Sequence, residues 1–398
     1  MKVLFVPLNE VLSHVIPLLA LNRKLVGSNI ETGFIMPRAG HRLFRQTGVN
    51  VLDIDHTGLR TEMVAYGQFS PDIVVDDLSL STGYATALSG MPRVTIQRTG
   101  LFPEGKPRNK NHRHSLKAVS RDVKELPDVT FMGLPQPQSV FDLFKANACI
   151  VTGVKSIEVL PESLRDHPRY FFSGPLLMDD FLVRDQAQLA SGNFSLNDFQ
   201  EFESLREFLE LNKERRVIYM TFGVIARATQ TLFDCLRGLL DMGVAIITSI
   251  KVDNLSPQQQ SSYYHASYLP MHFVCSHADL MIHQCGSGTY HYPLLHEIPA
   301  ITIGTQCYDR EDVALRLQEL GTSIHIPAPD ECDDFIGRFQ GTIERYFDES
   351  SDFHDETRKN IKKLKIEIEQ TSASFEFRQV LDVALDSARR SRKASLAS

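Results

Sequence analysis

Short apolar runs alternate with longer stretches of helical periodicity from the first residue onward. The runs that predict buried strands in the first half lie at residues 3–7, 30–36, 49–54, 73–75 and 94–96. Residues 14–25, between the first two runs, carry apolar side chains at helical spacing. Alternation of this kind predicts a parallel sheet with helices on both faces.

The alternation stops in a polar stretch and then resumes. Later apolar runs at residues 217–222, 245–250, 280–282 and 300–303 predict a second set of strands. The expected division is an N-terminal domain at residues 1–178, a linker at 179–204, a C-terminal domain at 205–375, and a helix end with a basic tail at 376–398. A chain of 398 residues agrees with two α/β domains.

Composition excludes several classes of protein. The formal charge of −7 disfavours a general nucleic-acid binder. The six cysteines are scattered without a CxxC pair, so neither a zinc site nor a disulfide framework is expected, and a cytoplasmic location fits. No apolar run approaches the ~20 residues of a membrane span, and the apolar start is too short for a signal peptide core.

One segment carries the strongest chemical signal. The apolar run at residues 280–282 ends in the small-residue turn Gly286-Ser287-Gly288-Thr289. A strand that ends in such a turn and opens a helix points backbone N–H groups at an anion above the strand end. Asp309 and Arg310 follow the next apolar run and should reach the same crevice. The segment therefore predicts a site for a phosphate or diphosphate.

Several ordered segments match a known pattern. They are Ser173-Gly174-Pro175-Leu176, Tyr219-Met220-Thr221-Phe222-Gly223, Tyr268-Leu269-Pro270-Met271, His277-Ala278-Asp279, Gln284-Cys285-Gly286-Ser287-Gly288-Thr289, Glu297-Ile298-Pro299 and Asp309-Arg310. Through them the chain resembles the inverting, nucleotide-sugar-dependent glycosyltransferases of the GT-B type, which include plant and bacterial natural-product glycosyltransferases. The resemblance implies two Rossmann-like domains that face each other across a cleft.

The resemblance also implies a donor site in the C-terminal domain. Tyr268 would stack on the nucleobase, and the turn from Gly286 to Thr289 would hold the diphosphate. Asp309 would accept hydrogen bonds from sugar hydroxyls. The other donor-binding residues so implied are Gly223, Val224, His283, Gln284 and Arg310.

In the N-terminal domain the resemblance implies a catalytic base. Ser13-His14-Val15-Ile16-Pro17 matches the His and Pro of the family pattern, which makes His14 the base that deprotonates the acceptor. Asp76 or Asp77 would orient its ring, and the spacing to Met91-Pro92 favours Asp76. The alternatives are a helix-terminal histidine without a proton to move and an aspartate that caps a helix.

The implied activity is inverting transfer of a sugar from a nucleoside diphosphate sugar, such as a UDP-sugar, to a hydroxyl or amine of a small molecule in natural-product biosynthesis. No cofactor and no metal are expected, because the turn would stabilise the leaving diphosphate. The partners would be the nucleotide sugar and the acceptor, without nucleic acid or a transmembrane segment, and the oligomeric state is left open.

Several positions depart from the family pattern. Gln284 stands where a histidine contacts the diphosphate, and Tyr292 stands where a carboxylate binds the ribose. Arg310 replaces a glutamine, and would either pair with an acidic sugar or form a surface ion pair. A second class of function therefore stays open, a GT-B homologue that has lost transfer and acts as a ligand-binding or accessory protein.

The polar stretch from Lys106 to Lys124 is rich in Lys, Arg and His. It is either a solvated surface excursion or a wall of the acceptor site that prefers an anionic acceptor. With the basic tail at residues 389–393 it could also touch an acidic membrane surface, although no apolar stripe accompanies either segment.

Overall fold

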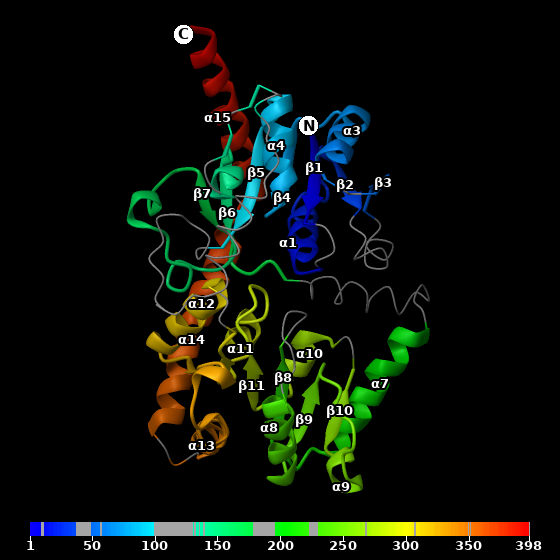
Figure 1. Cartoon of the computed structure of the whole chain (residues 1–398), viewed down its shortest axis with the longest axis vertical. Helices are drawn as coiled ribbons and strands as arrows, with labels where there is room; N and C mark the ends of the chain where they lie inside the picture. Colours follow the sequence, from blue (N-terminus) through cyan, green and yellow to red (C-terminus); the bar gives the residue numbers. More distant parts are fainter. Residues whose placement is uncertain are drawn as a thin grey trace. The chain divides into compact units, whose positions relative to one another are not determined.

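The computed structural model describes residues 1–8, 12–36, 49–55, 58–98, 130, 133–134, 136–137, 140–177, 196–222, 230–266, 269–305, 308–348, 350 and 352–397. The chain divides into two compact units (Figure 1). Unit 1 comprises residues 1–107, 113–178 and 369–398, and unit 2 comprises residues 108–112 and 179–368. Among the described residues, no helix is both long enough and apolar enough to cross a bilayer.

Unit 1 is built on a seven-stranded sheet in which every pairing is parallel. Its strand order is β3-β2-β1-β4-β5-β6-β7. The strands are β1 (Lys2–Pro7), β2 (Glu31–Met36), β3 (Val51–Asp55), β4 (Ile73–Asp77), β5 (Arg93–Gln97), β6 (Ala148–Val151) and β7 (Tyr170–Phe172). Order reverses between β1 and β4, and a ligand crevice in a doubly wound sheet lies at the carboxyl ends of the strands at such a point.

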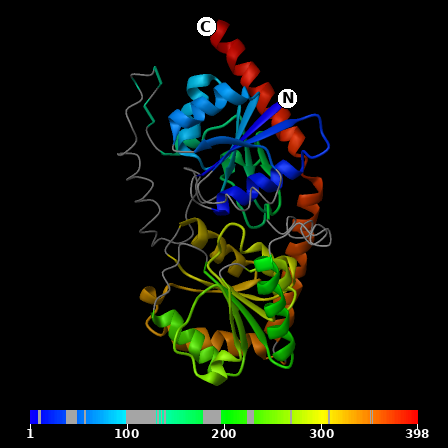
Figure 2. The same cartoon turned by 90° about the vertical axis from the view of Figure 1, so that its right-hand side faces the viewer.

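Helices cover both faces of this sheet (Figure 2). On one face, Leu4 and Val6 of β1 pack against α3 (Leu59–Phe69) and α4 (Leu80–Ser89). On the other, the Phe5 ring lies between those of Phe34 and Phe377, at centroid distances of 4.6 and 6.4 Å. The first helix, α1 (Leu12–Arg23), contacts β1 and β4 and buries Val15, Leu18, Leu19 and Leu21, which confirms the helical spacing of residues 14–25. Two 3-10 helices, η3 (Val140–Phe144) and η4 (Glu162–Leu164), complete the described connections.

Unit 2 repeats the architecture with six parallel strands in the order β10-β9-β8-β11-β12-β13. They are β8 (Val217–Thr221), β9 (Ala245–Thr248), β10 (Tyr263–His265), β11 (Leu280–His283), β12 (Ala300–Ile303) and β13 (Ser323–Ile326). The helices are α7 (Leu196–Leu211), α8 (Gln230–Asp241), α9 (Pro257–Gln260), α10 (Met271–Cys275), α11 (His291–Leu295), α12 (Tyr308–Glu319), α13 (Phe335–Phe347) and α14 (Asp352–Ser374), with the 3-10 helix η5 (Pro329–Glu331). The core lies between the sheet, α8 and α13, and the order reverses between β8 and β11.

Two segments differ from the expected organisation. Part of the expected linker is helical, since α7 begins at Leu196; residues 178–195 lie outside the described residues. The expected helix end and basic tail form a continuous helix, α15 (Phe377–Ala397). Phe377, Val380, Leu381 and Ala384 of α15 are buried in unit 1, against β5 and β6. This apolar stripe anchors α15 to unit 1.

Candidate active site

The first candidate site lies at the switch point of unit 1. Asp77 is the last residue of β4 and pairs in register with Pro7 at the end of β1. His14 stands in the first turns of α1, the helix that follows β1, and its ring Nδ1 lies 2.9 Å from Oδ1 of Asp77. A parallel sheet thus brings together two residues that are 63 positions apart in the sequence.

The structure corrects the expected partner of His14, which is Asp77 rather than Asp76. Successive side chains of a strand point to opposite faces of the sheet. Asp77 shares its face with α1, whereas Asp76 pairs in register with Val6, on the face covered by α3 and α4. Both aspartates follow the same apolar run, so their order in the sequence did not distinguish them.

Asp77 has a second buried partner, Arg98, which the sequence analysis missed. The guanidinium holds both carboxylate oxygens: Nη1 donates to Oδ1, and Nη2 donates to Oδ2 at 3.1 Å. Asp77 is fully buried, and its burial favours the neutral acid, but Arg98 and then His14 outweigh this effect and hold the pKa of Asp77 below its ordinary value. Arg98 directly follows an apolar strand, which was the available signal.

Asp76 belongs to a separate buried network with Arg93. Arg93 Nε donates to Oδ1 of Asp76 at 2.7 Å, and Nη2 donates to Oδ2 at 2.9 Å. Burial raises the pKa of Asp76, and the Arg93 charge opposes that rise. The carboxylate also accepts the backbone N–H of Ser79, the cap residue of α4, at 3.0 Å. These contacts give Asp76 a structural role close to the capping alternative.

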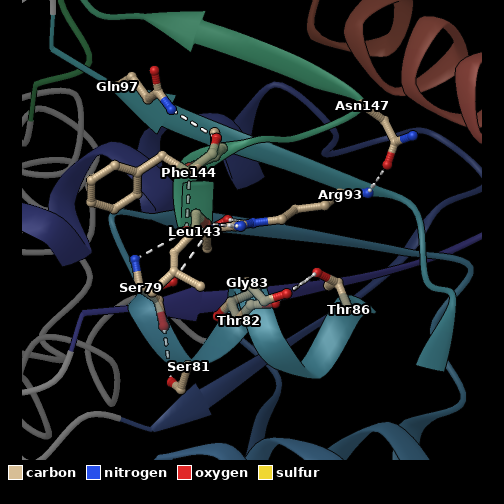
Figure 3. Close-up of polar contacts among 12 residues, drawn as sticks. Ser79, Ser81, Thr82, Gly83, Thr86, Arg93, Gln97, Leu143, Phe144 and Asn147 are labelled. Atoms are coloured by element: carbon tan, nitrogen blue, oxygen red, sulfur yellow. Dashed lines mark hydrogen bonds and ion pairs between the residues drawn. The ribbon is translucent and has the colours of Figure 1, made fainter. Parts of the chain in front are cut away.

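Figure 3 shows how tightly Arg93 is enclosed. Its Nη1 donates to the carbonyl of Leu143 in η3, and its backbone N–H donates to Asn147 Oδ1 at 3.0 Å. Gly83 of α4 faces the same carbonyl, and a Cβ there would lie 2.6 Å from the Leu143 oxygen. Glycine is therefore required where α4 approaches η3, and the network fixes the face of the sheet opposite His14.

The second candidate site lies at the switch point of unit 2, after β11. Cys285 adopts a left-handed conformation with φ of 51°, and Gly286, Ser287, Gly288 and Thr289 follow as a half-exposed turn. Thr289 N–H donates to the Gly286 carbonyl at 2.8 Å. Among the hydrogen bonds of the described residues, none is donated by the backbone N–H of Gly286 or Gly288. The turn thus presents donors to a ligand.

The helix after this turn is short, since α11 spans only His291–Leu295. It includes Pro293 and is followed by Glu297 in a left-handed conformation with φ of 57°. The macrodipole of so short a helix is small, because few peptide dipoles add up along it. An anion at the turn would therefore be held mainly by hydrogen bonds from the N–H groups of the turn.

His283 and Gln284 are less open than expected. His283 is fully buried, which lowers its pKa to about 3, and its Nδ1 accepts the Cys285 N–H at 3.0 Å. This bond braces the left-handed residue of the turn. Within the described part of the chain, His283 Nε2 and Gln284 Oε1 are buried without a hydrogen-bond partner. The buried His283 ring therefore supports the turn from inside the domain. It does not lie on the half-exposed side of the turn, where a ligand would bind.

Tyr292, at the position of the expected ribose carboxylate, is also buried. The His272 ring of α10 meets the Tyr292 ring edge to face at 5.1 Å, and His272 Nδ1 lies 2.6 Å from His296 Nε2. Burial, then His272 and Lys365, lower the pKa of His296 to about 4. This aromatic cluster ties α10 to α11 and offers no carboxylate to a ribose.

Asp309 and Arg310 lie in the first turn of α12, the helix that follows β12. Arg310 is half-buried, and none of the ion pairs between described residues includes it. The Asp309 side chain, Gly223, Val224 and Tyr268 lie outside the described residues. Their expected roles stay predictions.

A buried network that the sequence analysis missed holds the start of α12. Glu311 Oε2 lies 2.9 Å from Nε2 of His325 in β13, and His325 Nδ1 lies 2.9 Å from the hydroxyl of Thr302 in β12. The other Glu311 oxygen accepts the Thr305 N–H at 2.6 Å. Gly304 fits only without a side chain, because a Cβ would lie 2.5 Å from the Ala328 nitrogen. The segment that carries Asp309 and Arg310 is thus fixed to the sheet.

The fold is that of natural-product glycosyltransferases. The chain is similar to the spinosyn forosaminyltransferase SpnP, with a TM-score of 0.65, 16% identity, and coverage of 97% of this chain and 99% of that one. It is similar to Os79 from O. sativa in complex with U2F and trichothecene, with a TM-score of 0.69, 13% identity, and coverage of 97% and 100%. The spinosyn rhamnosyltransferase SpnG complexed with thymidine diphosphate gives a TM-score of 0.64 at 17% identity over 94% and 98%.

No family model and no curated protein matches the sequence. The solved structures therefore identify a two-domain α/β fold of the GT-B glycosyltransferase type, shared over nearly the full length of each chain.

Proposed function

We propose that the protein is an inverting glycosyltransferase that moves a sugar from a nucleoside diphosphate sugar to a hydroxyl, or an amine, of a small-molecule acceptor. The observation that carries the proposal is the His14–Asp77 pair at the switch point of unit 1. The half-exposed turn at the switch point of unit 2 supports a diphosphate leaving group. Neighbours with this fold include one complexed with thymidine diphosphate and one complexed with UDP-glucose.

The geometry of unit 1 suits proton transfer. Because Asp77 accepts at Nδ1, we assign the ring proton to that nitrogen, which leaves the lone pair on Nε2. The acceptor O–H gives its proton to Nε2 as the oxygen bonds to the anomeric carbon. The bond from that carbon to the diphosphate breaks on the opposite face, which inverts the configuration. Asp77 stabilises the imidazolium that forms.

We infer that the turn of unit 2 receives the charge that grows on the leaving diphosphate. The N–H groups of Gly286 and Gly288 can donate to its oxygens, and the hydroxyls of Ser287 and Thr289 add further donors. Preorganised donors of this kind support transfer without a metal ion. Tyr268, Asp309 and Arg310 are proposed to contact the base and the sugar, and the protein is proposed to act in the cytoplasm.

The buried Tyr292 favours a second candidate, a homologue that binds a ligand but has lost transfer. Without a carboxylate at this position the ribose would be held by other groups. One measurement distinguishes the transferase from the ligand-binding homologue. Only the transferase should transfer sugar from the donor at a rate that depends on His14.

The test combines binding with turnover. UDP, dTDP, GDP, ADP and CDP are screened by thermal shift, and at 100 Kd a ligand of the native state stabilises it by ~2.7 kcal/mol. Hydroxylated aromatic and macrocyclic acceptors are then assayed by mass spectrometry with the matching nucleotide sugars. His14→Ala should lower transfer by about 10²–10⁴-fold and leave the thermal shift intact, because base catalysis supplies about that factor.

His167→Ala is the matched control, an imidazole of unit 1 that lies before β7 and should leave transfer unchanged. Equal transfer by the wild type and His14→Ala would remove His14 from the mechanism. Nucleotide binding without any transfer would favour the ligand-binding homologue.

A further inference from the structure

Arg98 forms an ion pair with Asp77, the same carboxylate that contacts His14. It directly follows β5, which lies beside β4 in the sheet, and its side chain is 5% exposed. Its Nη1 and the His14 Nδ1 both contact Oδ1 of Asp77, and its Nη2 closes a fork on Oδ2 at 3.1 Å. A fork of two parallel bonds fixes a carboxylate more rigidly than a single contact does.

Asp77 has few charged neighbours among the described residues. Asp77 shares its face with Pro7 of β1, Ile96 of β5, and α1. From these elements, and among the described residues, the titratable or charged groups that contact Asp77 are His14 and Arg98. Asp76 and Arg93 pair with each other on the opposite face. The carboxylate that His14 contacts therefore already carries a bound cation.

The Arg98 charge reduces how strongly the Asp77 carboxylate favours a protonated His14 ring. With Asp77 alone, a proton on His14 would create an ion pair, and the carboxylate would favour the charged ring. Arg98 already compensates the charge of that carboxylate and contacts the same oxygen. A proton on His14, which is half-buried, then adds a second positive charge beside the buried Arg98 and Asp77, where screening by water is weaker than in bulk solvent.

We propose that Arg98 is a positioning residue for transfer, which holds Asp77 in place and keeps His14 in its proton-accepting form at a lower pH than Asp77 alone would allow. The proposal rests on the proposed role of His14 as the base. Its consequence is that the acidic limb of the pH–rate profile lies at lower pH in the wild type than in variants without the charge of Arg98.

The direct test is NMR titration of the His14 ring in the full chain, with its signal assigned by its loss in His14→Ala. Arg98→Met removes the charge, and Arg98→Gln removes it while keeping a donor for Asp77 so that the fold is retained. Both should move the titration midpoint of His14 to higher pH, as expected for loss of a neighbouring like charge. Arg98→Lys loses the fork but keeps the charge, so its midpoint should stay closer to that of the wild type than the midpoints of the two neutral variants do.

The acidic limb of kcat/KM should shift with the midpoint, whereas a merely structural role would lower kcat at every pH and leave the limb in place. An unchanged or lowered midpoint in Arg98→Gln overturns the proposal whether or not the protein transfers sugar. If the midpoint shifts as predicted but the protein transfers no sugar, the proposed function is rejected. The effect of Arg98 on His14 is then still supported.

Discussion

The adjacent residues Asp76 and Asp77 have different partners because successive side chains of a strand point to opposite faces of the sheet. Asp76 and Asp77 both end β4, but Asp76 joins Arg93 in a buried structural network and Asp77 joins His14 and Arg98. Position in the sequence places both at the carboxyl end of a strand, where ligand sites occur. The register with β1 and the packing of α1 on one face decide which of them orients the imidazole.

The lowered pKa of Asp77 makes a prediction about stability. A carboxyl whose folded pKa lies below its unfolded value, about 3.9, stabilises the fold above that pH and ceases to do so as pH falls through the folded value. Asp77→Asn should cost about 3 kcal/mol at pH 7, because it removes the buried charge that both ends of the Arg98 fork contact. Denaturant unfolding should show that the difference in free energy of unfolding between the wild type and Asp77→Asn narrows below about pH 4.

Asp72→Asn provides the comparison, since its carboxylate is exposed and accepts the Lys2 N–H at 2.7 Å. Its effect should stay below about 1 kcal/mol at pH 7. A difference between wild type and Asp77→Asn that stays constant from pH 7 to pH 3 would contradict the assigned ionisation of Asp77.

The strands that end at the two switch points position the two candidate sites. The sequence predicted the β11 turn correctly, because a strand, small residues and a helix start are local signals. It did not predict the brace from His283 to Cys285, or the Glu311–His325–Thr302 network that joins α12 to β12 and β13. Those contacts need the register between strands, which single residues do not reveal.

Glu311 gives a prediction for the element it anchors. Glu311→Ala removes the acceptor of the Thr305 N–H and the partner of His325, both in a buried setting, and should destabilise the protein by about 2–4 kcal/mol. The KM for the nucleotide sugar should rise, because Asp309 and Arg310 begin the same helix. Denaturant unfolding and initial rates would measure the two effects.

Glu319→Ala lies on the same helix and removes an exposed i,i+3 pair with Arg316. It should cost less than about 0.5 kcal/mol and leave KM unchanged. If Glu311→Ala were equally mild in both measurements, the network would not fix the start of α12.

At the scale of the whole molecule, the end of the chain belongs to unit 1. Helix α15 buries Phe377, Val380, Leu381 and Ala384, although these residues follow the whole of unit 2 in the sequence. Helix α14 correspondingly belongs to unit 2 up to Ile368 and to unit 1 from Glu369. Unit 1 therefore assembles from segments that lie far apart in the chain.

Truncation tests this assembly. Removal of residues 376–398 should unfold unit 1, since each buried apolar side chain contributes about 1.5–3 kcal/mol and a domain is stable by only about 5–15 kcal/mol. Removal of residues 392–398 alone keeps the buried residues of α15 and should leave the melting temperature nearly unchanged. Calorimetry separates the outcomes, and an intact unfolding transition in the longer truncation would show that α15 is dispensable.

Hydrophobic periodicity and small-residue turns are local properties, so the sequence alone was enough to predict the two α/β halves and the turn after β11. The role of His14 as a base came from the family resemblance and stays a prediction. The tertiary structure decided that Asp77 and not Asp76 meets His14, that Arg98 shares its carboxylate, and that α15 completes unit 1. Each of these depends on strand register, on the alternation of side chains, or on packing between distant segments. Local signals, such as the strand before Arg98 and the apolar stripe of α15, mark these residues, but their partners arise only when the sheet is assembled.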